Sequence, residues 1–148
     1  MKLLLLHAED IEVKYLKWPY KFCVGINAVN LSKMPLDYDI YILTGTCGSL
    51  YRKRTNEFAV YNFYTIRYDE ILNYDNAREL GFKYIDMEVE IVQKFFEKLN
   101  KSLWIRKYIL DFCDKPSLFH DNRIWHTFQH KRMQKKIQKE LEYVHILA

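Results

Sequence analysis

The sequence predicts a single α/β domain spanning residues 1–148, built as a compact mixed sheet flanked by helices. Short apolar, β-rich runs alternate along the chain with segments of helical periodicity, a pattern typical of a sheet covered by helices on both faces. The length of 148 residues suits one domain. A hydrophobic content of 49%, with 12 Tyr and 9 Phe, is typical of a packed core and excludes a disordered chain.

The strands are expected where apolar runs stop at a glycine or a polar segment. In chain order they cover residues 3–6, 22–24, 39–43, 58–68 and 103–110, and residues 82–85 lead into a helix. The last run is apolar and β-rich, as expected of a strand covered on both faces. Gly45 and Gly48 are expected to break the third strand into a tight loop.

The helices are expected at residues 10–16, 27–34, 75–80 and 87–99, with Asp10 as a candidate N-cap of the first. In the fourth helix, the apolar residues at Met87, Ile91 and Phe95 fall on one face. A final amphipathic helix is predicted because four apolar residues recur at helical spacing: Met133, Ile137, Leu141 and Val144.

Charge and cysteine content narrow the function classes. The net charge of +4 is mild, so it gives little support for nucleic-acid binding. Cys23, Cys47 and Cys113 form neither a disulfide framework nor a zinc pattern, which suits a reducing compartment. The leading apolar run is too short for a signal peptide, and no run approaches the ~20 apolar residues of a membrane span. The sequence therefore predicts a soluble, cytoplasmic protein that binds neither nucleic acid nor membrane.

Two carboxylates stand out against their surroundings. Glu88 lies one turn before Val92, on the apolar flank of its predicted helix, where a surface carboxylate is unexpected. Asp111 follows the carboxyl end of the last predicted strand. Since ligands of open α/β sheets bind outside the carboxyl ends of strands, we expect Glu88 and Asp111 to share one crevice.

Three separated motifs, in this order, resemble those of the nucleoside phosphorylase and nucleosidase superfamily. Residues 2–12 look like its first strand and acidic loop, and residues 44–50 resemble its glycine-rich ribose loop. The run Asp86-Met87-Glu88, then a helix and a strand ending at Asp111 with Asp114 beyond, matches its third motif. Leu110 replaces a serine of that motif, and the chain is shorter than usual members, with loops that look trimmed. The resemblance implies a nucleoside phosphorylase-like fold.

The resemblance also implies roles for particular residues. Asp111 would act as the general acid that protonates the leaving purine, whereas a helix N-cap is the alternative role. Glu12 would activate water, with Glu9 and Asp10 as rivals, and a solvated acidic helix start is the alternative. Glu88 would hold the ribose hydroxyls, because a carboxylate accepts two donors, and the alternative is a first-turn glutamate favoured by the helix dipole. The residues expected to line the substrate are Met87, Thr46, Cys47 and Gly48.

The predicted function is therefore hydrolysis of the N-glycosidic bond of a purine nucleoside, of the methylthioadenosine/S-adenosylhomocysteine or futalosine type, by a homodimer. No metal or cofactor is expected, since His126 and His130 lie four residues apart but lack a third ligand. Leu43, uncharged, stands where phosphorylases of this superfamily usually bring a basic residue, which favours water as the nucleophile. The alternatives are a phosphate-dependent phosphorylase and a degenerate, non-catalytic nucleoside-binding homolog.

Overall fold

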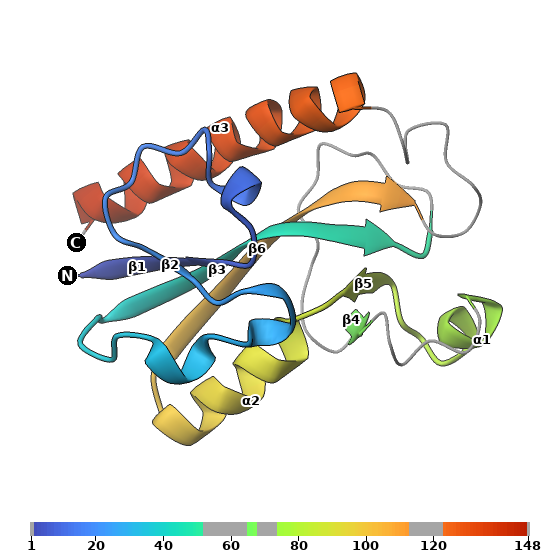
Figure 1. The fold of residues 1–148 in the computed structure, drawn as a ribbon, viewed down its shortest axis with the longest axis horizontal. Helices are drawn as coiled ribbons and strands as arrows, with labels where there is room; N and C mark the ends of the chain where they lie inside the picture. The colour runs from blue at the N-terminus through green and yellow to red at the C-terminus, as the bar shows by residue number, and fades with distance from the viewer. Residues whose placement is uncertain (1, 52–64, 68–73, 113–122, 148) are drawn as a thin grey trace.

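A six-stranded mixed sheet forms the centre of the protein (Figure 1). The computed structural model describes residues 2–51, 65–67, 74–112 and 123–147, and every statement below concerns these residues. The strands are β1 (Leu3–His7), β2 (Lys21–Cys23), β3 (Ile40–Ser49), β4 (Thr65–Arg67), β5 (Tyr84–Asp86) and β6 (Ser102–Phe112). They run in the order β2-β1-β3-β5-β4, with β6 also paired to β3. All pairs are parallel except β3 with β5, which confirms the predicted mixed sheet.

The long strand β3 is the axis of this sheet. β1 pairs with its first half, from Leu3↔Ile40 to Leu6↔Leu43, and β6 pairs with it along the whole length. β1 ends halfway along β3. Beyond that point, β5 pairs with β3 in its place, antiparallel, at Gly48 and Ser49. The prediction that Gly45 and Gly48 break this strand into a loop is wrong. Pairing with β6 keeps both glycines within the strand, although a glycine usually weakens one.

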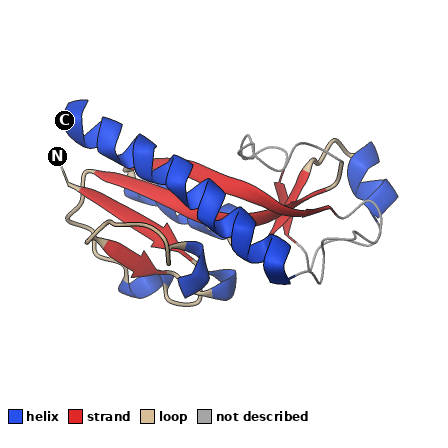
Figure 2. Cartoon of the chain, turned by 90° about the horizontal axis from the view of Figure 1, so that it is seen from above, coloured by secondary structure: helices blue, strands red, loops and turns tan. Residues whose placement is uncertain are grey.

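Helices cover the two faces of the sheet, as predicted. α2 (Val89–Leu99) lies on one face and α3 (Arg123–Leu147) crosses the other, while the short α1 (Tyr74–Glu79) lies beside β4 and β5 (Figures 1 and 2). Side chains of β1 and β3 alternate between the faces with period two. The core under α2 includes Leu4, Leu6, Tyr41, Leu43, Val92 and Phe96, whereas the core under α3 includes Leu3, Leu5, Ile42, Tyr108, Met133 and Ile137.

Two predicted helices are replaced by short 3₁₀ turns, the first by one turn and the second by two. The first is reduced to η1 (Asp10–Glu12), and the segment after it is held instead by two glutamines of α3. The Oε1 atom of Gln134 accepts from the Tyr15 amide at 2.9 Å, and Oε1 of Gln138 accepts from the Lys17 amide at 2.8 Å. Since these side chains satisfy the backbone, no helix is needed there.

The second predicted helix, over residues 27–34, is divided into η2 (Ile26–Ala28) and η3 (Leu31–Lys33). Asn27 has a φ of 60°, which a continuous right-handed helix excludes. The helix predicted at residues 87–99 is observed from Val89, one residue after its N-cap position, Glu88. Most of the strand predicted at residues 58–68 lies outside the described residues, apart from β4. None of the described helices has the length and apolarity to cross a bilayer.

Candidate active site

Glu12, at the end of η1, is held by four hydrogen bonds although it is buried. Its Oε1 accepts from the backbone amides of Ala8 and Glu9, each at 2.9 Å. Its Oε2 accepts from the Thr46 amide at 2.6 Å and from the Thr46 hydroxyl at 3.2 Å. These four donors satisfy both oxygen atoms of the buried carboxylate and fix its direction. The structure thus brings together two predicted site residues that are 34 residues apart in the sequence, Glu12 of η1 and Thr46 of β3.

Gly45 is the residue that lets Glu12 lie against β3. A Cβ atom at this position would overlap the Glu12 carboxylate, and the backbone φ of +132° is one that other residues rarely adopt. The glycine is therefore required by close approach rather than by a turn.

Lys107 lies on β6, in register with Gly45 of β3, and only 1% of the lysine is exposed to solvent. Its Nζ donates to Oε1 of Glu88, and it lies 3.8 Å from Oδ2 of Asp86. Both carboxylates are buried as well. The α2 N-terminus and the end of β5 thus supply two anions to one buried cation.

Burial and mutual charge interactions together determine the pKa values in this cluster of Lys107, Asp86 and Glu88. Burial on its own would lower the pKa of Lys107, but the carboxylates of Glu88, Asp86 and Glu12 outweigh it and raise that pKa. Burial raises the pKa of Asp86 to about 6, with Lys107 opposing the rise and Glu88 adding to it. Asp86 Oδ1 accepts from the Val89 amide at 3.3 Å, whereas its buried Oδ2 has no hydrogen-bond partner among the described residues. Lys107 is therefore ionised, and Asp86 is the member that titrates near neutral pH.

The remaining predicted residues surround this cluster to different extents. Cys47 is buried against Tyr84 and Ile109, and Met87 is half-buried between β5 and α2. Asp111 is in β6, in register with Gly48, and its side chain lies outside the described residues, as does all of Asp114. The expected meeting of Glu88 with Asp111 thus stays a prediction, and the observed partner of Glu88 is Lys107.

The rival bases differ from Glu12 in exposure. Glu9 and Asp10 are both exposed, whereas Glu12 is buried. Burial, followed by the charges of Glu12 and Glu88, raises the pKa of Glu9. Of the three, only Glu12 makes the contacts with β3 described above.

Sequence reasoning missed Lys107. A signal for it existed, because a lone lysine stands in a run expected to be covered on both faces of the sheet. A lysine at such a position must be paired with a carboxylate. The two acids nearest in the fold, Asp86 and Glu88, were already part of the recognised motif.

The histidine pair on α3 does not form a metal site with the described residues. His130 Nδ1 is 2.6 Å from the Tyr108 hydroxyl, which makes it part of a polar network. Among the residues that the structure describes, the group that could hold an ion is a different one, in which single ligand atoms of His7, Asp10 and Cys23 lie within 4.8 Å of one another.

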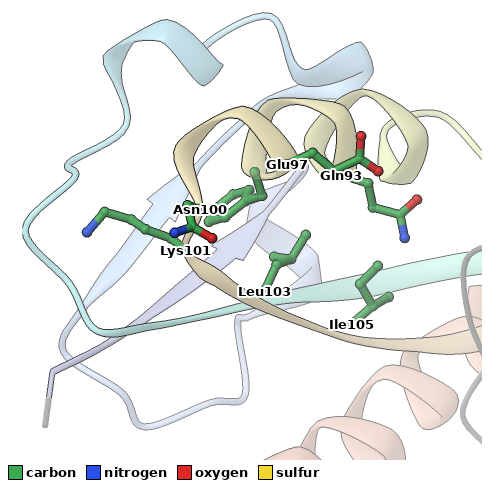
Figure 3. Close-up of a pocket in the computed structure, with 7 residues that line it drawn as sticks. Gln93, Glu97, Asn100, Lys101, Leu103 and Ile105 are labelled. Carbon is green, nitrogen blue, oxygen red and sulfur yellow. The ribbon is translucent and has the colours of Figure 1, made fainter.

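A pocket of about 390 Å³ lies away from the cluster, between the second half of α2 and the first half of β6 (Figure 3). It is lined by Gln93, Phe96, Glu97, Asn100, Lys101, Leu103 and Ile105. None of the predicted site residues is among them, so this pocket is not the candidate active site.

Comparison with known proteins identifies the fold. No protein-family model matches the sequence. No curated protein matches it in sequence either. Among solved structures, a nucleosidase of MTA and SAH superposes with a TM-score of 0.69 at 9% identity, over 96% of this chain and 95% of that one.

Two further structures agree with this result. The 5'-methylthioadenosine nucleosidase of Arabidopsis thaliana, in apo form, gives a TM-score of 0.64 at 12% identity, over 96% of this chain and 95% of that one. An MTAN protein of Chlamydia trachomatis bound to MTA gives 0.63 at 10% identity, over 98% and 97%. The predicted nucleoside phosphorylase-like architecture is therefore confirmed as the fold of the MTA/SAH nucleosidases.

Proposed function

We propose that this protein hydrolyses the N-glycosidic bond of a purine nucleoside of the methylthioadenosine/S-adenosylhomocysteine or futalosine type. The observation that carries the proposal is a pair of buried carboxylates in a nucleosidase fold: Glu12 is bound by Thr46, Glu88 is bound by Lys107, and the charge of Glu12 also acts on Lys107. The fold by itself hosts more than one activity, so the proposal depends on these side chains.

The reaction needs a base that activates water, and Glu12 is the proposed base. Its carboxylate is held in one direction by hydrogen bonds from Ala8, Glu9 and Thr46. A fixed, charged acceptor is suited to take a proton from an attacking water. As water attacks the ribose carbon, its proton passes to Glu12 and the glycosidic bond breaks.

The reaction also needs stabilisation of the sugar as the bond breaks and protonation of the leaving base. Positive charge develops on the ribose ring as the bond breaks, and the carboxylate of Glu88 favours that charge and accepts from the ribose hydroxyls. The electrons of the broken bond leave with the purine, and Asp111 protonates it as general acid. Met87, Thr46, Cys47 and Gly48 are proposed to line the sugar and base.

Water rather than phosphate is the proposed nucleophile because of the charge balance at the site. Three carboxylates, those of Glu12, Asp86 and Glu88, face one cation, Lys107. Their excess of negative charge repels a phosphate dianion, which needs cations or clustered amides. Leu43, at the position where a basic residue would serve phosphate, is fully buried in the apolar core under α2. Arg52 and Arg54, the cations that would reverse this argument, lie outside the described residues.

The test is an assay of purine release from methylthioadenosine, S-adenosylhomocysteine and futalosine in phosphate-free buffer. The Glu12→Gln variant is expected to lose at least ~100-fold in rate, as for removal of a general base. Glu9→Gln is the matched control, because it changes an exposed acid three residues away and leaves the Glu9 amide in place. Equal rates for both variants would remove Glu12 from the mechanism.

Asp111→Asn tests the proposed acid in the same assay, with an expected loss of at least ~100-fold and an unchanged circular dichroism spectrum. Strong stimulation of the wild type by millimolar phosphate, with ribose 1-phosphate as product, would replace hydrolysis by phosphorolysis. Calorimetric binding of adenine or methylthioadenosine without any release of base would leave a degenerate nucleoside-binding protein.

The proposed partners are the small nucleoside and a second copy of this chain, in the cytoplasm. Several large apolar side chains are exposed, among them Val29 at 72% and Leu80 at 68%, and exposed apolar surface often marks an interface. Light scattering is expected to give the mass of a dimer. A monomer mass that does not change with concentration would contradict this.

A further inference from the structure

His7 and Cys23 lie side by side at the ends of two neighbouring parallel strands. They are register partners of β1 and β2, so both side chains project from the same face of the sheet, with their Cβ atoms roughly 5 Å apart. Asp10 follows three residues after His7, at the first position of η1. One ring nitrogen, one carboxylate oxygen and the Cys23 sulfur all lie within 4.8 Å of one another. The register of β1 with β2, rather than any spacing in the sequence, creates this cluster.

We propose that His7, Asp10 and Cys23 form a binding site for a divalent transition-metal ion, with Zn²⁺ as the ion that fits best. Imidazole, carboxylate and thiolate are the three side-chain types that bind Zn²⁺, and a mixed set of three leaves the fourth tetrahedral position to water. Magnesium and calcium are disfavoured, because they take oxygen ligands and two of these three ligands offer nitrogen and sulfur.

The distances in the cluster suit this ion after a small adjustment. Tetrahedral bonds of about 2.0–2.3 Å place ligand atoms about 3.3–3.8 Å apart, so the ion draws the three atoms together by roughly 1 Å. Asp10 is exposed, which leaves its carboxylate free to rotate, whereas His7 is buried and fixed in place by β1. The moving ligand is thus the exposed one.

The local hydrogen bonds prepare two of the ligands. His7 Nδ1 lies 3.1 Å from the carbonyl oxygen of Glu9, which can only accept, so Nδ1 donates this bond and Nε2 is the nitrogen proposed to bind the ion. Such a bond from the second nitrogen orients metal-bound histidines in general. The Cys23 thiol donates to the Ala8 carbonyl at 3.3 Å. When the ion binds, the Cys23 sulfur loses its proton to solvent and forms the bond to the metal.

The site lies on the turn that holds Glu12 but shares no side chain with the proposed catalytic group. Ala8 and Glu9, whose amides bind Glu12, supply the carbonyls that bind Cys23 and His7. The metal site does not depend on the nucleosidase proposal, and its test needs no substrate.

The test uses the full-length chain freed of metal with a chelator and titrated with Zn²⁺ by calorimetry, and with Co²⁺ by absorption spectroscopy. We expect one ion per chain and, with Co²⁺, the thiolate charge-transfer band together with the strong visible bands of tetrahedral cobalt. Cys23→Ser is expected to abolish the charge-transfer band. Asp10→Asn is expected to weaken Zn²⁺ binding at least ~10-fold, at the lower end of what losing a supporting group costs.

Matched controls separate this site from adventitious binding. Asp37→Asn changes another exposed aspartate and Cys47→Ser another cysteine, both outside the cluster, and each is expected to keep the wild-type affinity and spectrum. Circular dichroism checks that all four variants are folded. Absence of Zn²⁺ binding by the wild type, or a charge-transfer band that survives in Cys23→Ser, would overturn the proposal.

Discussion

Lys107 and Tyr108 are neighbours on β6 that point to opposite faces of the sheet, and the two faces stabilise these buried polar groups by different means. On the α2 face, Lys107 is compensated by charge, through Glu88 and Asp86. On the α3 face, the Tyr108 hydroxyl is part of a neutral network. It accepts from Gln134 Nε2 at 3.1 Å and forms a second hydrogen bond with His130 Nδ1 at 2.6 Å. The α2 face holds buried ions, whereas the buried groups around Tyr108 on the α3 face are joined by hydrogen bonds between uncharged groups, and the Arg106–Glu140 ion pair of that face is partly exposed.

The difference indicates which face serves chemistry. Replacing a buried ion pair by apolar residues is often neutral or stabilising, so such a cluster is poorly explained by stability alone. Groups with displaced pKa values gather at functional sites, and the ionic face carries Asp86, with a pKa of about 6. A neutral network with every partner in place makes the core rigid instead. We therefore assign chemistry to the Lys107 cluster of the α2 face together with Glu12, and architecture to the hydrogen-bond network of Tyr108 on the α3 face.

The largest expected effect follows from removing the cation of the ionic face. Lys107→Met leaves Glu88 and Asp86 buried without a counter-charge, and breaking a buried pair in this way costs about 3–5 kcal/mol. Urea unfolding measures the loss. Lys94→Met is the matched control, since Lys94 pairs with Glu90 at 2.8 Å on the exposed side of α2 and such pairs contribute at most about 0.5 kcal/mol. Similar losses for the two variants would show that the ionic face is not a closed cluster.

The second effect is a pH dependence of the stability of the protein, which comes from Asp86. Its folded pKa of about 6 lies above its ordinary value of 3.8, so the folded state keeps a proton that the unfolded chain releases. The stability contributed by this group is present below about pH 4 and is lost as the pH rises through about 6. The wild type is expected to lose up to about 3 kcal/mol in this window from Asp86 alone, and Asp86→Asn is expected to lack that loss. Unfolding curves at a series of pH values measure the difference, and parallel profiles of the two proteins would contradict it.

His130, on the α3 face, is expected to change the stability with pH in the opposite direction to Asp86. Burial lowers the pKa of His130 below its ordinary value of 6.5, so the folded state disfavours a proton that the unfolded chain accepts. The stability from this group is present above pH 6.5 and is lost as the pH falls below that value. His130→Gln is therefore expected to flatten the acid side of the profile and to leave the loss caused by Asp86 unchanged.

The third effect separates sugar binding from base binding. If Glu88 holds the ribose, Glu88→Gln loses charged hydrogen bonds worth about 1.5–3 kcal/mol, so methylthioadenosine binds roughly 10–150-fold more weakly. Free adenine has no ribose, and its affinity is expected to stay the same. Calorimetry with both ligands provides the measurement. An equal weakening for adenine and methylthioadenosine would show that Glu88 acts only as the partner of Lys107.

Much of the fold could be predicted because it depends on local patterns. The apolar run of β1, the stripe of α2 and the helical spacing around Met133 in α3 all led to elements that the structure contains. The errors come from distant contacts. The segment after η1 is not helical because Gln134 and Gln138, more than a hundred residues away, bind its backbone. Gly45 remains in a strand because β6 pairs with it. Local propensity carries no information on either contact.

The site was predicted in part for the same reason. Glu12 and Glu88 stand in short motifs, so their types and spacing could be recognised in the sequence. Lys107 belongs to no such motif, and its burial has meaning only once Asp86 and Glu88 are seen beside it. The cluster of His7, Asp10 and Cys23 depends on a strand register, which no single segment specifies. A single sequence therefore does not predict the site residues whose role depends on contacts between different strands of the sheet.

The smallest effect tests the architectural role of the neutral face. Tyr108→Phe removes one buried hydroxyl and keeps the ring that packs edge-on against His130 with centroids 5.7 Å apart. Gln134 Nε2 keeps a second partner, the Ile11 carbonyl at 2.7 Å, so only His130 Nδ1 is left without its bond. A loss of about 1–2 kcal/mol is expected, the cost of one unpaired buried group. The rate of base release is expected to stay within about twofold of the wild type, because the Tyr108 hydroxyl bonds Gln134 and His130 rather than Glu12 or Glu88. A large loss of activity without a matching loss of stability would mean that the α3 face also takes part in the chemistry, and the division between the two faces would fail.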